Sequence, residues 1–412
     1  MIQQLTSPTD MRRINRQALL EVIWGEAIMT AAELVEGSGL TRATVYAACD
    51  ELIAQGWIVE LDRQRAPNEA RGRPSRRFQF AYDSGAVVAI DAGSHSVRVA
   101  VTNLTGRLRA TKETPLAGDT QDMSDRQERV RSTVRAALQE AKTSPELVVC
   151  ATLAIPAPVN ANGCVPEKNA FWRLMHADLP GILNDLLQAP VLVENDANLA
   201  AFAEFAQRFS PEDNRGPRDL LAVLSGWRTQ SGIISDGHLI RGSRGRAGES
   251  SGLTLVKGVN NTIGAYRWIA EDAARLLKES STPSLMRVRG DTELTSEYVL
   301  GLSKQSDPVA MKAVEHAGRR LGRILATQIA LLDPEVAVVC GSAVPLAKET
   351  MPFLHAEVAR VVGIDNVPVI ECSALGSDVV LVGAIARSLE HIRSHTEDII
   401  IAERPEQDAL PQ

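Results

Sequence analysis

Several kinds of residue and segment are scarce in this chain of 412 residues. Its five cysteines are scattered without a Cys-x-x-Cys pair, which fits a reducing compartment and argues against a disulfide framework. It contains no run of about eighteen apolar residues, and residues 1–10 lack the basic and apolar stretches of an export signal. These absences predict a cytoplasmic protein without a membrane partner.

The overall composition is that of an ordinary globular protein, with 44% apolar and 23% charged residues. A chain of this length exceeds what one hydrophobic core usually serves, so we expect at least two domains. The net charge of -7 gives no sign of nucleic-acid binding, but six arginines and only one acidic residue lie between Arg63 and Arg77. A basic segment inside an acidic protein suggests a polyanionic partner.

The N-terminal residues, 1–82, have the pattern of a winged helix-turn-helix. Helical spacing and β-alternation predict helices at 13–24, 31–36 and 41–53 and antiparallel strands at 57–61 and 77–80. Thr30 and Glu33 form a capping box at the second helix, and the glycines around Ser38 make the turn before the third. The arginine-rich stretch then becomes the wing between the two strands.

The second helix of such a motif lies in the major groove, and its N-terminal residues meet base edges. The predicted readers and phosphate contacts on that helix are Thr41, Arg42, Thr44 and Tyr46. In the wing, Gly72 and a proline hold the chain narrow between Arg71 and Arg73, which suits a minor groove. The alternative interpretation of the wing is a solvated basic loop.

After a short linker at 82–85, strands and helices alternate, which predicts an α/β fold with mixed sheets. Three phrases in this second part, Ile155–Val159, Val193–Asn198 and Gly245–Glu249, resemble the ROK family of repressors and sugar kinases. The resemblance covers almost the whole chain, and the 41–57 helix region and the Gly72–Pro74 wing resemble the family's repressor branch. It implies an actin-like, ribonuclease H-like sugar-kinase fold in two lobes.

On this resemblance the second domain spans 86–396. Its small lobe covers about 86–195 together with a C-terminal helix at 380–396, and its large lobe covers about 196–379. Residues 397–412 are expected to form a polar tail. No internal repeat is visible in the sequence.

The resemblance also assigns a sugar site. Asp196 occupies the position of the kinases' general base, while Asn169, Asn195 and Glu249 match residues that contact sugar hydroxyls. Neighbouring amide and carboxylate groups are suitable partners for such hydroxyls. Two alternatives stay open: Asp196 as a helix N-cap, and Glu249 as a loop carboxylate paired with Arg244 or Arg246.

The phosphate-binding parts of the family pattern are altered. The first loop keeps Asp91 and Gly93, and the second keeps Gly226 and Gly232, but Trp227 and its neighbours put bulk where small residues are usual. Residues 250–270 contain neither Cys nor His, so the family's structural zinc cannot be built there. We therefore expect no metal, no ATP and no other cofactor.

These observations predict a DNA-binding repressor of carbohydrate uptake or catabolism genes, with a non-catalytic domain that senses a sugar or sugar phosphate. Its expected partners are a double-stranded DNA operator, that effector and further copies of the chain in a homodimer or homotetramer. One alternative is an ATP-dependent sugar kinase with an accessory DNA-binding domain, which Asp91 and Asp196 favour. Another is a DNA-binding scaffold without a ligand.

Overall fold

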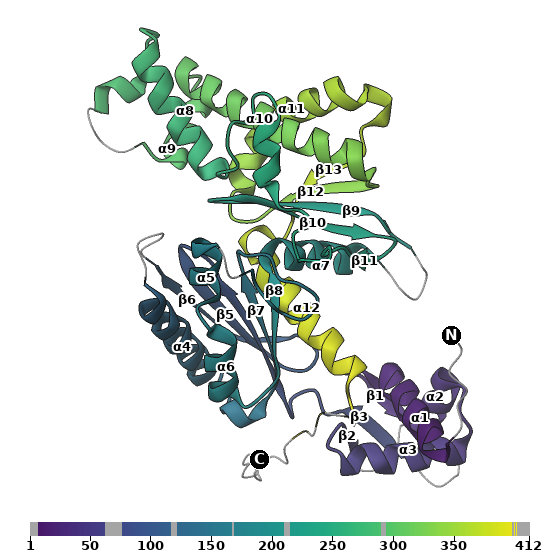
Figure 1. Cartoon of the computed structure of the whole chain (residues 1–412). Coiled ribbons are helices and arrows are strands. Elements are labelled where there is room, and N and C mark those ends of the chain that lie inside the picture. Colours follow the sequence, from purple (N-terminus) through teal and green to yellow (C-terminus); the bar gives the residue numbers. More distant parts are fainter. Residues whose placement is uncertain are drawn as a thin grey trace.

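The computed structural model describes residues 7–61, 76–116, 122–166, 169–209, 215–289, 294–397, 399 and 401. A small N-terminal domain lies beside the end of helix α12 (Val379–Ser394), and two larger lobes follow it (Figure 1). None of the described helices is long and apolar enough to cross a membrane.

The N-terminal domain is a winged helix built on three helices and a three-stranded antiparallel sheet of order β1-β3-β2. Its elements are α1 (Pro8–Ile23), β1 (Ile28–Thr30), α2 (Ala31–Ser38), α3 (Arg42–Ala54), β2 (Ile58–Leu61) and β3 (Arg77–Phe80). The expected capping box at Thr30 and Glu33 is present, and Thr41 caps α3. Strand β1 was not expected from the sequence.

The small lobe is a five-stranded sheet of order β6-β5-β4-β7-β8, covered on one face by helices. Its elements are β4 (Ala86–Ala92), β5 (Ser96–Thr102), β6 (Leu108–Pro115), α4 (Met123–Glu140), β7 (Val148–Ile155), α5 (Ala170–His176), α6 (Leu179–Leu187) and β8 (Val191–Asn195). Strands β4, β5 and β6 are antiparallel neighbours, whereas β7 and β8 run parallel to β4. The parallel pairing brings the carboxyl ends of β4, β7 and β8 to one edge, which faces the large lobe (Figure 1).

The large lobe has a second sheet, of order β11-β10-β9-β12-β13. Its strands are β9 (Leu220–Ser225), β10 (Thr229–Ser235), β11 (His238–Leu239), β12 (Val336–Cys340) and β13 (Val369–Cys372). Its helices are α7 (Asp196–Arg208), α8 (Ala265–Glu279), α9 (Ser296–Lys304), α10 (Pro308–Leu332) and α11 (Val344–Val362). Helices α8, α9, α10 and α11 contribute to one apolar core on a single face of this sheet.

The two sheets have the same topology, because an antiparallel meander is followed by two parallel strands in each. This duplication is the two-lobed actin-like architecture that was expected, although the sequence contains no repeat. Helices α7 and α12 belong to the core between the two sheets.

The N-terminal domain and the small lobe share one apolar core. Fully buried Trp57 and Phe80 belong to the same cluster as Val87 and Cys150 of the small lobe and Ile392 of α12. Residues that follow α12 also contact the N-terminal domain. Among those that the structure describes, Ile401 is buried against Gly56, and Glu397 forms an ion pair with Arg16.

Candidate functional site

A cavity of about 830 Å³ lies between the two lobes. Its lining includes Asp91, Gly93, His95, Asp196, Gly226, Trp227, Arg228, Gln230 and Tyr266. The structure therefore brings the first altered loop, the second altered loop and the predicted base position to one cleft. Gly232 is not among the described lining residues. It lies inside β10, where an added Cβ would come 2.2 Å from the Ala197 carbonyl oxygen, so close packing against α7 explains this glycine.

Asn195 and Asp196 lie where β8 passes into α7. Asn195 is the N-cap of α7, since its Oδ1 accepts a hydrogen bond from the Asn198 N–H at 3.1 Å. Its Nδ2 donates to the Ala157 carbonyl at 3.1 Å and to Gln230 Oε1 at 3.2 Å. Asp196 is consequently the first helical residue and not the N-cap, which excludes the alternative considered for it. Its carboxylate lines the cavity.

Asp91, Asp196 and Glu249 form a group of interacting carboxyls. Burial raises the pKa of Asp91 to about 6, against the opposing effect of the Arg98 and Arg126 charges. Burial also raises the pKa of Asp196 well above its usual range, and the neighbouring Asp91 charge adds to the rise. Burial raises the pKa of Glu249 as well. Asp91 and Asp196 line the cleft, whereas Glu249 is not among its described lining residues. Perturbed carboxyls at a cleft are typical of a functional site.

The loop carrying Glu249 is fitted closely onto both lobes. A Cβ on Gly245 would lie 2.2 Å from the Val159 carbonyl oxygen, and one on Gly248 would lie 1.7 Å from that of Ser231. Both glycines have positive φ, +69° and +81°, which other residues rarely adopt. The glycines of the Gly-Arg-Ala-Gly-Glu phrase thus set the position of Glu249.

A buried ion pair fixes the start of the same loop. Arg241 donates from Nε to the buried carboxylate of Glu194 at 2.7 Å, and its Nη2 lies 2.6 Å from the same oxygen. The other Glu194 oxygen accepts from the Asn195 N–H and from Asn198 Nδ2. The Glu-Asn-Asp-Ala-Asn phrase and the glycine loop therefore hold each other in place.

The third predicted sugar contact, Asn169, is exposed and is the N-cap of α5, accepting from the Trp172 N–H at 3.1 Å. Two arginines of the large lobe lie over the next aromatic side chains of α5. Arg228 lies 3.9 Å from the Phe171 ring centre, and Arg246 lies 5.4 Å from that of Trp172. In the described part of the chain, no ion pair within 4.0 Å joins Glu249 to Arg244 or Arg246, although the Arg246 charge opposes the rise in the pKa of Glu249.

Two stacked rings occupy the phosphate side of the cleft. His95, in the turn after β4, stacks on Trp227 in the turn between β9 and β10, with ring centres 4.0 Å apart and planes 7° apart. Tyr266 continues the stack at 6.1 Å from Trp227. Phosphate transfer requires small residues and free backbone N–H groups at these turns. Bulky side chains therefore stand at the two turns where the family pattern has small residues.

Arg126 of α4 is a site-building residue that the sequence analysis missed. It is fully buried, and it donates to the carbonyls of Ala92, Gly93 and Met175, the last two at 2.8 and 3.2 Å. Burial lowers its pKa to about 10, although the Asp91 charge opposes this. Arg126 thus ties the first loop to the end of α5. The sequence shows Arg126 only as one arginine on an amphipathic helix. It does not show that this arginine is buried while others on the helix are exposed.

The segment after Glu249 forms a short 3-10 helix, Ser250–Leu255. Its side chains offer no thiolate or imidazole, and no group of three or more potential metal ligands occurs in the described residues. The residues present therefore do not fit the zinc of the family pattern.

In the winged helix, the predicted readers lie at the start of α3. Arg42 and Thr41 are exposed, whereas Thr44 and Tyr46 are half-buried. Arg42 donates to the Tyr46 hydroxyl at 3.1 Å, and the Thr41 and Thr44 hydroxyls lie 2.9 Å apart. The predicted wing residues Arg71, Gly72 and Arg73 lie outside the described residues.

The acidic residues of α3 are paired with arginines from other elements. Glu51 pairs with Arg16 of α1 at 2.5 Å, and Asp50 pairs with Arg76 at 2.7 Å. Arg76 also lies over the Tyr46 ring at 5.4 Å. These pairs offset the negative charge of the helix and leave Arg42 at its exposed N-terminal end, as a phosphate-facing or base-reading helix requires.

Comparison with known proteins agrees with this architecture. A model of the ROK family matches residues 87–389, and the chain therefore belongs to the ROK family. It is similar to the xylose repressor of Bacillus subtilis (strain 168), with 21% identity over 86% of this chain and 89% of that protein. It is equally similar to the DNA-binding transcriptional dual regulator NagC of Escherichia coli (strain K12), with 21% identity over 84% of each chain.

Solved structures share the fold. A ROK family transcriptional regulator described as a homologue of the E. coli MLC protein has a TM-score of 0.68 and 19% identity, covering 92% of this chain and 96% of its own. A ROK family glucokinase from Streptomyces griseus has a TM-score of 0.60 and 21% identity, covering 74% of this chain and 100% of its own. The first likeness includes the N-terminal region, and the second covers an extent close to that of the two lobes.

Proposed function

We propose that this protein is a sugar-responsive DNA-binding repressor whose ROK domain binds its effector without phosphorylating it. The observation that carries the proposal is the combination of a winged helix, built onto the small lobe, with a cleft that keeps Asp91 and Asp196 while the stacked rings of His95 and Trp227 line the turns that bind phosphate in the family pattern. The relatives named as repressors support the same role.

The proposed effector is a sugar or sugar phosphate that binds between the lobes. Asp196 and Glu249 accept hydrogen bonds from its hydroxyls, Asn195 positions Asp196, and Asn169 lies at the rim on α5. Arg228, over Phe171, is the group that would meet a phosphate. The proposed target is a double-stranded operator read by α3 and the wing, bound by a homodimer or homotetramer because paired half-sites require paired recognition helices.

A sugar kinase with an accessory DNA-binding domain is the second candidate, because Asp91 and Asp196 remain at the cleft. The candidates differ in their response to nucleotide. A kinase binds MgATP and releases ADP when sugar is present, whereas a sensor binds sugar alone.

The test is calorimetric titration of the full chain with a panel of sugars, with sugar phosphates and with MgATP. We expect one class of sugar to bind, Asp196→Ala to abolish that binding and MgATP to give no heat. Asp185→Ala, which changes an exposed aspartate of α6, is the matched control. If no sugar or sugar phosphate gives heat, the sensing role is refuted. Sugar-dependent release of ADP would establish the kinase.

DNA binding is tested separately by selecting sequences from a random duplex library and measuring their affinity by fluorescence anisotropy. We expect a selected sequence to bind more tightly than random duplex, and the sugar found by calorimetry to change that affinity. A wild-type protein that selects no sequence would refute the repressor.

A further inference from the structure

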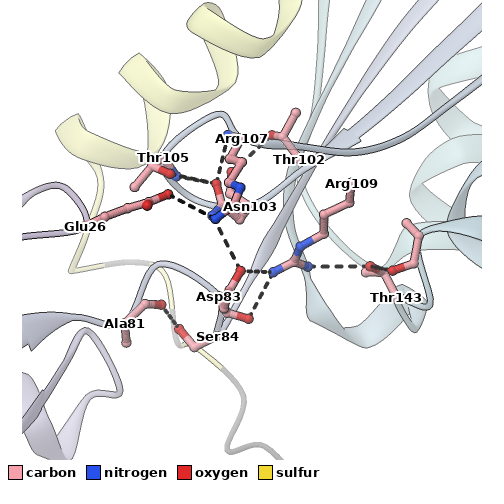
Figure 2. A network of polar contacts seen from close by, with 11 residues as sticks. Glu26, Ala81, Asp83, Ser84, Thr102, Asn103, Thr105, Arg107, Arg109 and Thr143 are labelled. Carbon is pink, nitrogen blue, oxygen red and sulfur yellow. Dashed lines mark hydrogen bonds and ion pairs between the residues drawn. The ribbon is translucent and has the colours of Figure 1, made fainter.

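The linker between the winged helix and the small lobe is held by side chains of the small lobe (Figure 2). Asp83, in this linker, accepts hydrogen bonds at Oδ1 from Arg109 Nη2 at 2.9 Å and from Asn103 Nδ2 at 3.4 Å. Arg109 also donates to the Asp83 carbonyl at 3.1 Å. The linker is therefore fixed by both its side chain and its backbone.

Asn103 begins the turn between β5 and β6, residues 103–106, which we call the β5–β6 turn. Its Oδ1 accepts from the Thr105 N–H at 3.0 Å, the Thr105 hydroxyl at 2.8 Å and the Arg107 N–H at 2.9 Å. Arg107 in turn lies 3.9 Å from Glu26 of the winged helix (Figure 2). One amide side chain thus shapes the turn and contacts the linker.

Leu104, at the next position of the β5–β6 turn, is fully buried in the core that includes Trp57 and Phe80 of the winged helix. Its backbone N–H donates to the Tyr82 carbonyl at 2.9 Å. A Cβ on Gly106, at the end of the turn, would lie 3.3 Å from the Leu389 side chain of α12. The turn therefore packs against the linker, the winged helix and α12 together.

Strands β4 and β5 reach the cleft at the end opposite the β5–β6 turn. Strand β4 runs from Ala86, close to Asp83, to the cleft at Asp91, and β5 returns from the cleft to the turn. At about 3.3 Å per residue, each strand spans about 23 Å, and paired strands of a buried sheet transmit displacement with little bending.

From these contacts we propose that the β5–β6 turn docks the winged helix on the small lobe in one fixed orientation. Asn103, Leu104 and Arg109 are then positioning residues for DNA recognition. The small lobe and helix α3 move as one body, so any change in the angle between the lobes displaces α3 by the same rotation. The part that concerns DNA rests on the proposed repressor function.

Docking is measured without DNA, as the distance between two spin labels in the full chain. The labels are attached at Glu36→Cys on α2 and Arg135→Cys on α4, which change exposed residues. Cys164→Ser and Cys372→Ser remove the two cysteines that are not buried, so that no other position is labelled. In a mixture with an excess of unlabelled chain, so that each oligomer holds at most one labelled chain, pulsed electron paramagnetic resonance of the otherwise unchanged chain is expected to give one narrow distance distribution. A broad distribution would overturn the proposal.

Two variants test the turn. Leu104→Ala removes the buried anchor, and Asn103→Asp keeps the oxygen that the turn needs but places a carboxylate against Asp83. We expect both to lose the single narrow distance while the far-ultraviolet circular dichroism is retained, and Asn103→Asp decides if Leu104→Ala does not fold. Lys112→Ala, on β6 of the same hairpin, breaks an ion pair with Glu140 of α4 and is the matched control. A narrow distance retained in Asn103→Asp would overturn the proposal.

The consequence for DNA is read from duplexes carrying two in vitro selected half-sites at different separations. Wild type should prefer one separation sharply, and Asn103→Asp should lose that preference while binding a single half-site as wild type does. If Asn103 had a purely structural role, Asn103→Asp would lower the affinity for paired half-sites and for a single half-site together. If wild type selects no DNA, the proposed function fails, whereas the distance measurement still decides docking.

Discussion

The Asp91 carboxyl provides a quantitative test of the cleft. In an unfolded chain it titrates near its ordinary value of 3.8, whereas in the folded protein burial raises its pKa to about 6. Between these two values the folded state holds a proton that the unfolded state has released. The free energy of unfolding therefore falls as the pH rises across this window. A shift of about two pH units corresponds to about 3 kcal/mol of stability lost by the time the carboxyl is ionised.

Asp91→Asn removes this ionisation and leaves the side chain close to its original size. Over about pH 4 to pH 7, we expect wild type to lose about 3 kcal/mol relative to the variant. Part of the raised pKa of Asp196 comes from the Asp91 charge, so the variant also relieves Asp196, which changes stability in the same direction. The Arg126 guanidinium stays charged over this pH range because its pKa is about 10. It therefore adds only a pH-independent difference between the unfolding free energies of wild type and variant.

The assay is denaturant unfolding of wild type and Asp91→Asn at a series of pH values, with Asp185→Asn as a control at an exposed aspartate. The two profiles should diverge as the pH rises and become parallel above about pH 7. Parallel profiles over the whole range would refute the burial argument, and a divergence of opposite sign would mean that Arg98 and Arg126 dominate the environment of Asp91.

Three further predictions concern DNA, nucleotide and sugar. Arg42→Ala should weaken binding to selected DNA by about 1–3 kcal/mol and relax its base preference, measured by anisotropy, and an unchanged preference would remove Arg42 from the readers. The double variant His95→Gly and Trp227→Gly removes both rings from the phosphate side of the cleft, so a non-hydrolysable MgATP analogue should bind to it in calorimetry. If no heat is measured, another feature of the cleft excludes the nucleotide. Gly248→Ala should abolish sugar binding but keep DNA binding, because the new Cβ would lie 1.7 Å from the Ser231 oxygen, and full sugar affinity would show that the loop can shift.

The parts of the fold that depend on local chemistry could be predicted from the sequence. The helix starts at Thr30 and Thr41 are determined by side chains within three residues, and both are present as expected. Strand β1 was missed because three residues give no periodicity, and its pairing with β3 is made by residues far along the chain. The N-cap alternative for Asp196 stayed open because Asn195 and Asp196 are adjacent and both are good caps, and only the end of β8 decides between them.

The cleft could be predicted only in part. The phrase around Asp196 marked one side of the cavity, and the structure places Asp91 and Asp196 together on its lining, but Glu249 is not among the described lining residues. The His95 and Trp227 stack, by contrast, joins two turns from different lobes, and neither ring has a local signal for the other. Arg126 and the β5–β6 turn were missed for the same reason, since their partners become neighbours only after folding.

The glycines at 232, 245 and 248 have a consequence for judging distant relatives. Each presses main chain against main chain, at separations where any side chain would collide with a carbonyl oxygen. Gly245 meets Val159 of the small lobe, whereas Gly232 and Gly248 pack against Ala197 and Ser231 within the large lobe, so all three positions resist substitution whatever chemistry the cleft performs. A pseudoenzyme and an active kinase would retain them alike. In this architecture Gly245 reports that the two lobes still fit together, and Gly232 and Gly248 report that the packing inside the large lobe is kept.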